Sequence, residues 1–157
     1  MKRITTLLSA LAISFTALSQ TTLPTTWDCS GATPNGWTLS GTTFYTGSGN
    51  PLPAIRFDNT GDYVDIYFTD DPGPLTYDLT GNSFSGGTFT VLESVNGTAW
   101  TTLRTITSPP SGTYSPFTDN PQLTSRYIRF EYTLKVSGNI GVDNITIAVA
   151  PATPNAE

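Results

Sequence analysis

Tyrosine and aspartate side chains alternate in the segment YVDIY, where Tyr63, Asp65 and Tyr67 occupy every second position. In an extended strand this spacing places the three side chains on one face, with Val64 and Ile66 on the other. A sugar ring can stack its apolar face on a tyrosine while a neighbouring carboxylate binds the sugar hydroxyls. The segment therefore predicts a carbohydrate-binding surface if its polar face is exposed. The alternative is that the two tyrosines are core or corner residues.

Further residues could complete this ligand-binding surface. They combine aromatic rings for stacking with planar polar groups for hydrogen bonding: Trp37, Tyr45, Asn50 and Arg56. Tyr114 is another aromatic candidate. Trp100 is different, because it follows the hairpin signal Asn96-Gly97-Thr98 and is expected to pack inside the protein.

The chain has no histidine, and its carboxylates are not arranged for catalysis. Without histidine there is no serine–histidine triad, no cysteine–histidine dyad and none of the commonest zinc sites. Glycosidases use two facing carboxylates, but Glu93 and Glu131 each lie in an alternating strand. Glu131 is expected to form a surface ion pair with Arg129. We therefore expect a protein that is not an enzyme; a hydrolase using carboxylates alone is the weakest alternative.

The composition is acidic and includes a single cysteine. Twelve acidic residues outnumber seven basic ones, and the net charge of −5 disfavours nucleic acid and anionic membranes as partners. Cys29 is the only cysteine, so no intrachain disulfide can form. We expect its thiol to be buried rather than lipidated, because the preceding Thr26-Trp27-Asp28 is not a lipoprotein motif.

The N-terminal segment has the three parts of a secretory signal peptide. Lys2 and Arg3 provide the basic start, residues 7–18 the apolar core, and Ala17-Leu18-Ser19 the small-residue cleavage site. The expected organisation is as follows: a signal peptide at 1–19, one domain at 20–149, and a flexible tail or linker stump at 150–157. We expect a secreted, extracellular or cell-surface protein without membrane insertion, since no later segment is long and apolar enough to span a bilayer.

After residue 20 the sequence reads as short strands separated by turns. This pattern predicts an all-β fold, a two-sheet antiparallel β-sandwich. Residues 125–147 are expected to close the domain as a hairpin that turns at Ser137-Gly138-Asn139. Asp143 and Asn144 interrupt the alternation of its second strand, which predicts a bulge or a bound cation. Stretches rich in Gly, Pro and Ser or in Asp are expected to be loops: 70–74, 81–87 and 108–118.

Three parts of the chain together resemble a secreted jelly-roll module of Bacteroidetes, of the galactose-binding-like and carbohydrate-binding type. They are GWT at 36–38 with GSGN at 47–50 and IRFDNTGDY at 55–63; ESVNGTAWTTL at 93–103; and SRYIRF at 125–130 with GNIGVDNI at 138–145. The resemblance implies jelly-roll topology. It also implies a role beside secreted hydrolases exported by the type IX system, although no catalytic or sorting domain is recognised within these 157 residues.

The same resemblance implies a structural calcium ion. In related jelly rolls an acidic residue near the first strand and an aspartate in the last strand bind Ca²⁺, and Asp28 and Asp143 resemble those two positions. Calcium takes six to eight oxygen ligands, which the carboxylates and loop carbonyls could supply. The alternative is that Asp143 makes turn or bulge hydrogen bonds and that Asp28 is solvated.

These features predict a secreted, non-catalytic binding module. The expected partner is a glycan or cell-surface polysaccharide, and the resemblance adds a role as an accessory to a secreted enzyme. The alternative is a cell-surface adhesion or assembly protein that binds a protein partner through an exposed sheet face.

Overall fold

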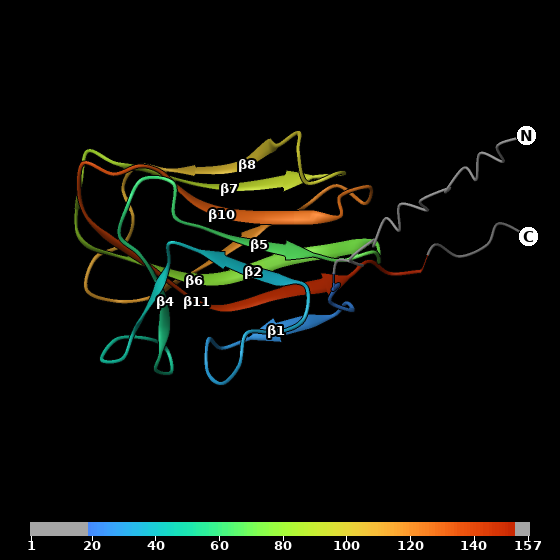
Figure 1. Ribbon diagram of the computed structural model, residues 1–157, viewed down its shortest axis with the longest axis horizontal. Helices are drawn as coiled ribbons and strands as arrows, with labels where there is room; N and C mark the ends of the chain where they lie inside the picture. The colour runs from blue at the N-terminus through green and yellow to red at the C-terminus, as the bar shows by residue number, and fades with distance from the viewer. Residues whose placement is uncertain (1–18, 153–157) are drawn as a thin grey trace, which may run out of the picture.

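The computed structural model describes residues 19–152, which form an all-β domain (Figure 1). Within these residues there are eleven strands and no helix. The strands are β1 (Thr25–Trp27), β2 (Trp37–Ser40), β3 (Thr43–Tyr45), β4 (Ala54–Phe57), β5 (Tyr63–Tyr67), β6 (Pro72–Ser85), β7 (Thr88–Ser94), β8 (Thr101–Ile106), β9 (Ser115–Asp119), β10 (Tyr127–Leu134) and β11 (Ser137–Val149). Apart from Ser19, the predicted signal peptide lies outside the described residues, as do residues 153–157 of the tail.

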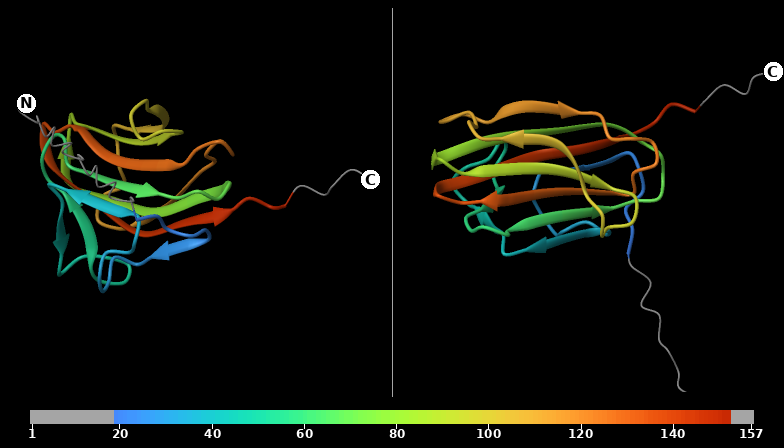
Figure 2. Two further views of the ribbon diagram at one scale, coloured as in Figure 1. Left: turned by 45° about the vertical axis from the view of Figure 1, so that its right-hand side comes forward. Right: turned by 90° about the horizontal axis from the view of Figure 1, so that it is seen from above.

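The strands form two sheets, and every pairing within them is antiparallel (Figures 1 and 2). The sheet with the order β3-β4-β11-β6-β9, in which β1 also pairs with β11, is called the β6 sheet. The sheet with the order β2-β5-β10-β7-β8 is called the β10 sheet. The predicted fold class, a two-sheet antiparallel β-sandwich, is confirmed.

The core lies between the two sheets, where apolar side chains alternate with outward-facing polar ones. In β5, Val64 and Ile66 are fully buried, whereas the residues between and beside them are partly exposed. Aromatic rings from opposite sheets meet edge to face: the ring centroids of Phe57 and Phe89 lie 5.0 Å apart. This packing fixes the inward face of each strand, so the opposite face of each sheet remains available for binding.

The predicted closing hairpin at residues 125–147 is wrong, because β10 and β11 belong to different sheets. Ser137-Gly138-Asn139, predicted to be its turn, forms the first residues of β11. The alternation of β10 correctly identified a half-buried strand, but alternation carries no information about the sheet in which the partner strand lies. The predicted bulge is confirmed: the register with β6 shifts between Asp143 and Thr146, and Asn144 has a φ of 48°.

Parts of the three segments predicted to be loops are strands. β6 extends from Pro72 to Ser85 and so includes parts of the predicted loops at 70–74 and 81–87, while β9 lies at the end of the predicted 108–118 loop. Long-range pairing of β6 with β11 and β9 overrides the local turn preference of glycine and proline. β1 pairs with β11, so the first and last strands of the domain lie side by side.

Candidate functional site

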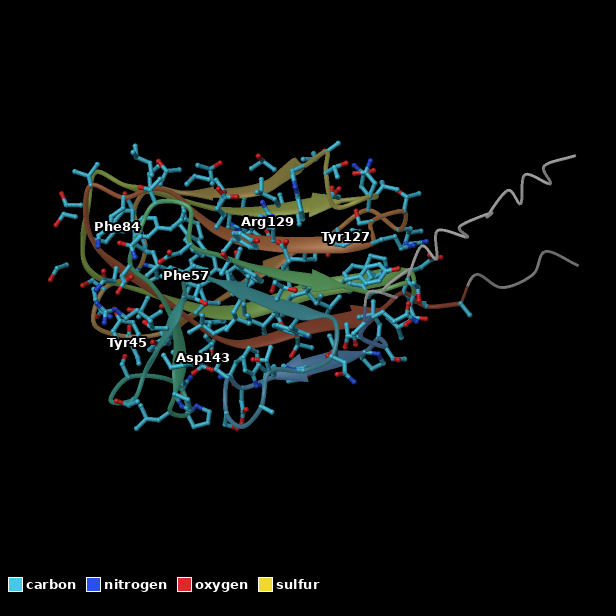
Figure 3. The ribbon with its side chains drawn as sticks, in the orientation of Figure 1. Tyr45, Phe57, Phe84, Tyr127, Arg129 and Asp143 are labelled. Carbon is cyan, nitrogen blue, oxygen red and sulfur yellow. The ribbon has the colours of Figure 1, made fainter. Side chains whose placement is uncertain are left out.

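The outer face of the β10 sheet carries a continuous group of aromatic and charged side chains. The register pairs Tyr67 with Tyr127 and Asp65 with Arg129 across β5 and β10. We call this group the aromatic face, and its members are Tyr63, Asp65 and Tyr67 of β5, Tyr127, Arg129 and Glu131 of β10, and Trp100, which directly precedes β8. All of these side chains are partly exposed. Figure 3 labels Tyr127 and Arg129 along β10.

Arg129 lies at the centre of the aromatic face, between two rings. Its Cζ atom is 4.2 Å from the ring centroid of Tyr63 and 4.3 Å from that of Trp100. Its Nε and Nη2 donate to the two carboxylate oxygens of Asp65, at 2.6 and 2.8 Å. The hydrogen bonds that Arg129 donates to Asp65 raise the pKa of Arg129 above its ordinary value. A planar guanidinium held by two hydrogen bonds and two rings has one orientation, so the centre of the face is preorganised.

The same guanidinium also reaches a second carboxylate. Arg129 Nη1 lies 3.6 Å from Glu131 Oε2, which confirms the ion pair predicted between these residues. The face therefore carries two carboxylates around one guanidinium. The charge of the guanidinium is compensated by these carboxylates, and the net charge of the aromatic face is slightly negative.

A second pair of rings extends the face along β5 and β10. Tyr67 and Tyr127 are stacked with centroids 4.7 Å apart and ring planes 19° from parallel. Trp100 meets Tyr127 edge to face at 6.3 Å, so this pair joins the group around Arg129. Burial is the main cause that raises the pKa of Tyr127, and the nearby Tyr67 is the second. Partly exposed rings beside carboxylates and a guanidinium can stack against a sugar and bind its hydroxyls at the same time.

The structure corrects the interpretation of Trp100. The sequence predicted a core position because Trp100 follows a hairpin turn, and the hairpin between β7 and β8 is present. However, Trp100 lies just before β8 and contacts Arg129 and Tyr127 on the outer face. A signal for the missed residues was present in the sequence, since Tyr127 and Arg129 lie on the same polar strand face as Glu131. The sequence did not reveal that β10 pairs with β5, which brings this face beside Asp65.

The seven residues predicted to bind ligand do not lie together. Tyr63, Asp65 and Tyr67 are on the aromatic face. Trp37 is in the core, 6% exposed, with its ring edge to face against Trp27 at 5.3 Å, and it is therefore not a stacking platform. The other three belong to the opposite side of the sandwich: Tyr45, Asn50 and Arg56.

On that opposite side, Arg56 and Tyr45 form a separate cluster. The Arg56 Cζ atom lies 5.3 Å from the centroid of the Tyr45 ring, and Nη2 forms an ion pair with Asp58 at 3.0 Å. The register between β3 and β4 places Tyr45 opposite Ala54 and Thr43 opposite Arg56. These residues are thus separated from the aromatic face by the core.

Asp143 is fully buried and accepts hydrogen bonds from the protein backbone. Its Oδ2 accepts from the Asn50 N–H and its Oδ1 accepts from the Asn144 N–H at 2.7 Å. Asn144 Nδ2 in turn donates to Asp78 Oδ2 at 2.9 Å and to the Asn50 carbonyl. Burial is the main influence that raises the pKa of Asp143. These bonds fix the loop around Asn50 to the bulge of β11, on the side of the sandwich where Figure 3 labels Asp143 and Tyr45.

The other predicted calcium ligand, Asp28, is engaged locally. Its Oδ1 accepts from the N–H and the hydroxyl of Ser30, at 3.0 and 2.6 Å, and the hydroxyl bond is the main cause of a lowered pKa of Asp28. Residues 19–152 contain no group of three or more His, Cys, Asp or Glu side chains that could hold a metal ion. A calcium ion here would have to share Asp143 with two backbone N–H groups, so this chain fits the expected ligand set only in part.

Cys29 lies next to this network. Its side chain is 2% exposed, and Sγ contacts the Val142 carbonyl oxygen at 3.6 Å, which confirms the predicted buried thiol. Burial is the main influence that raises its pKa. A thiol that stays protonated and buried is a packing residue rather than a nucleophile.

Among the described residues, no helix is long and apolar enough to cross a membrane. No known protein family matches this sequence, and no curated protein does.

Solved structures with a similar fold exist at low sequence identity. A cleaved adhesin domain of Lys-gingipain from Porphyromonas gingivalis has a TM-score of 0.65 and 15% identity, with 82% of this chain and 99% of that chain covered. A family 29 carbohydrate-binding module variant complexed with mannohexaose has a TM-score of 0.57 and 18% identity, with 78% and 90% covered. A xylan-binding domain of family 22 has a TM-score of 0.52 and 14% identity, with 75% and 89% covered. At these identities the likeness establishes the fold.

Proposed function

We propose that this protein is a secreted, non-catalytic binding module that holds a glycan chain on its aromatic face. The observation that carries the proposal is the convergence of four partly exposed rings on one sheet surface: Tyr63, Tyr67, Trp100 and Tyr127. They surround hydrogen-bonding groups that are already oriented by their own contacts. Stacking surfaces combined with fixed polar groups are what a sugar requires.

The charge of the face narrows the ligand class to uncharged polysaccharides. Arg129 is paired with Asp65 and lies near Glu131, so it offers no free cation to a uronate or sulfate group. The net charge of the chain, −5, opposes anionic chains as well. The similar family 29 and family 22 modules, whose names refer to mannohexaose and xylan, support the choice of neutral chains as probes.

Affinity electrophoresis in gels that contain mannan, xylan or polygalacturonate tests this proposal. The wild-type protein should be retarded by a neutral polysaccharide, and the Tyr63→Ala/Tyr67→Ala and Trp100→Ala variants should bind about 30-fold more weakly, the size of an aromatic hot spot. Phe44→Ala is the matched control, because it removes an exposed ring from the β6 sheet. Equal retardation of all variants, or retention by polygalacturonate alone, would contradict the proposal.

Protein adhesion is the second candidate function. The aromatic face is rich in tryptophan, tyrosine and arginine, the residue types that dominate protein–protein hot spots, and the similar gingipain domain is named an adhesin. Capture of a surface protein that is lost in Trp100→Ala, and that free neutral oligosaccharides do not compete, would favour adhesion over glycan binding.

A structural calcium ion bound by Asp143 with Asp28 is a separate proposal. Asp143 is the deeply buried carboxylate of the pair and lies on the bulge of the last strand. If calcium binds, Tm should rise when Ca²⁺ replaces EDTA, and Asp143→Ala should abolish the rise. A Tm that is the same in Ca²⁺ and EDTA would contradict the calcium proposal.

Secretion rests on the predicted signal peptide. N-terminal sequencing of the protein recovered from the medium or the cell surface should begin at Gln20 if cleavage follows Ser19. An intracellular protein that retains Met1 would contradict it.

A further inference from the structure

The outer face of the β6 sheet contains a cleft of about 450 Å³, on the side of the sandwich opposite the aromatic face. Thr80 and Asn82 of β6 contribute to its lining, together with two loops that are distant in sequence. One loop contains Ser48 and Asn50, and the other contains Thr113 and Tyr114. A cleft of this size is within the range of small-molecule sites.

Both loops are held in place by hydrogen bonds to the sheet. Asp143 and Asn144 bind the backbone of Asn50, and the Ala54 N–H donates to the Ser48 carbonyl at 3.1 Å. On the other side, the Gly81 N–H donates to the Pro110 carbonyl at 2.7 Å. The walls are therefore positioned before a ligand arrives, which lowers the entropy lost on binding.

Tyr114 links the two loops. Its hydroxyl accepts a hydrogen bond from Ser48 Oγ at 3.3 Å, and its ring end lies over Gly141 of β11. A Cβ atom at Gly141 would come within 2.5 Å of the Tyr114 hydroxyl, so this position of Tyr114 requires the absence of a side chain at 141. Burial is the first cause of the raised pKa of Tyr114.

The chemistry of the lining selects an uncharged ligand. It provides hydroxyls, two side-chain amides, one aromatic ring and glycine backbone, and it contains no Asp, Glu, Lys or Arg. The nearby carboxylates are already engaged. Asp78 accepts hydrogen bonds from the side-chain amides of Asn50 and Asn144, and Asp143 accepts from their backbone N–H groups. An anion or a cation would be desolvated here without a counter-charge, which is unfavourable.

We propose that this β6-sheet cleft is a second binding site, which takes a short, uncharged, hydroxyl-rich ligand such as the terminal sugar of a glycan. The site is independent of the aromatic face, because the core separates the two sheets. A single domain with both sites can hold two glycan chains at once, and bivalent attachment strengthens binding without any new contact.

NMR titration of the ¹⁵N-labelled protein with methyl glycosides of glucose, galactose, mannose and xylose tests the cleft. The expected result is saturable shifts of the Gly47, Gly49 and Gly112 amides with at least one glycoside. Thr113→Trp places a large ring in the cleft from an exposed loop position and should weaken this binding at least tenfold. Thr118→Trp is the matched control, since Thr118 is an exposed β9 residue outside the cleft lining.

Three outcomes would overturn the proposal. The first is that none of the four glycosides shifts the cleft amides of the wild-type protein. The second is that the shifts persist unchanged in Thr113→Trp, and the third is that glucuronate or glucosamine binds more tightly than the neutral sugars. The Tyr63→Ala/Tyr67→Ala variant keeps this test separate from the proposed function, because it should retain the cleft shifts even if the aromatic face binds nothing.

Discussion

The two outer faces of this sandwich present different kinds of surface, although both arise from the same alternation of inward and outward side chains. The aromatic face consists of strand residues and Trp100, whose large rings and charged groups bind one another, as Arg129 does with Tyr63 and Asp65. The β6-sheet cleft is lined mainly by small polar residues and glycines, most of them in two loops, and one of these loops is fixed through Asp143. Contacts between side chains organise the aromatic face, whereas hydrogen bonds to the loop backbone organise the cleft.

This difference determines how each face should respond to mutation. A face organised by side-chain stacking loses binding when one ring is removed, while the fold persists because the rings are half-exposed. A face organised by buried backbone hydrogen bonds loses stability when its buried acceptor is removed, because N–H groups remain without partners. The predictions below use this contrast, from the largest expected effect on stability to the smallest.

Asp143→Ala should destabilise the protein by roughly 3 kcal/mol, because the N–H groups of Asn50 and Asn144 lose a buried acceptor. The loop around Asn50 should become mobile, so cleft binding should be lost while polysaccharide binding by the aromatic face is retained. Urea unfolding measures the first effect and the two binding assays measure the second.

Asp143→Asn is the control for this variant, because it keeps the side-chain shape and one acceptor oxygen. It should cost less than Asp143→Ala. If Asp143→Ala is as stable as the wild type, Asp143 does not hold the loop and the contrast between the two faces fails.

Arg129→Ala should cost about 2 kcal/mol and should also impair glycan binding, because Asp65 loses a bidentate partner and two rings lose the cation between them. Arg129→Lys keeps the charge but not the planar fork, so it should restore only part of both properties. Urea unfolding and affinity electrophoresis measure the two effects. Full recovery of both by Arg129→Lys would show that charge alone is needed at the centre of the face.

Gly141→Ala should cost about 1 kcal/mol, because the added Cβ forces Tyr114 away from β11. The expected binding effect is confined to the cleft, where glycoside shifts should weaken while polysaccharide retardation stays the same. An equal loss at both sites would indicate a general disturbance of the sandwich.

The pH dependence of stability should reveal the buried carboxylate of Asp143. Burial raises its folded-state pKa above the ordinary value of 3.8, so between these two values the folded state binds more protons than the unfolded state. The contribution of Asp143 to the free energy of unfolding therefore falls as pH rises through this window and is greatest below it. In urea unfolding at acidic pH, wild type should gain stability relative to Asp143→Asn; a difference that is constant with pH would contradict this.

Much of the fold was predictable because burial alternation is a local property. The pattern of β5 identified Tyr63, Asp65 and Tyr67 as one outward face, and the irregularity at Asp143 and Asn144 identified the bulge. The boundaries of β6 and β9 were not predictable, because pairing with neighbouring strands overrode the turn preference of glycine and proline.

The candidate site was predictable only in part, for a related reason. The types of the residues indicated which could bind sugar, but not which would share a surface. Tyr45, Asn50 and Arg56 have suitable side chains yet lie on the other side of the sandwich, and Trp37 lies in the core. Trp100 was assigned to the core but lies on the aromatic face, where it contacts Arg129.

Composition and local alternation were enough to establish the all-β class, the apolar face of strands such as β5 and β10, and the supply of aromatic and uncharged polar groups. These follow from composition and a period of two, which neighbouring residues specify. The tertiary structure alone decided that β10 and β11 enter different sheets, that Arg129 lies between Tyr63 and Trp100, and that Asp143 fixes a distant loop. Each of these depends on contacts between residues far apart in the chain, and local pattern cannot specify such contacts.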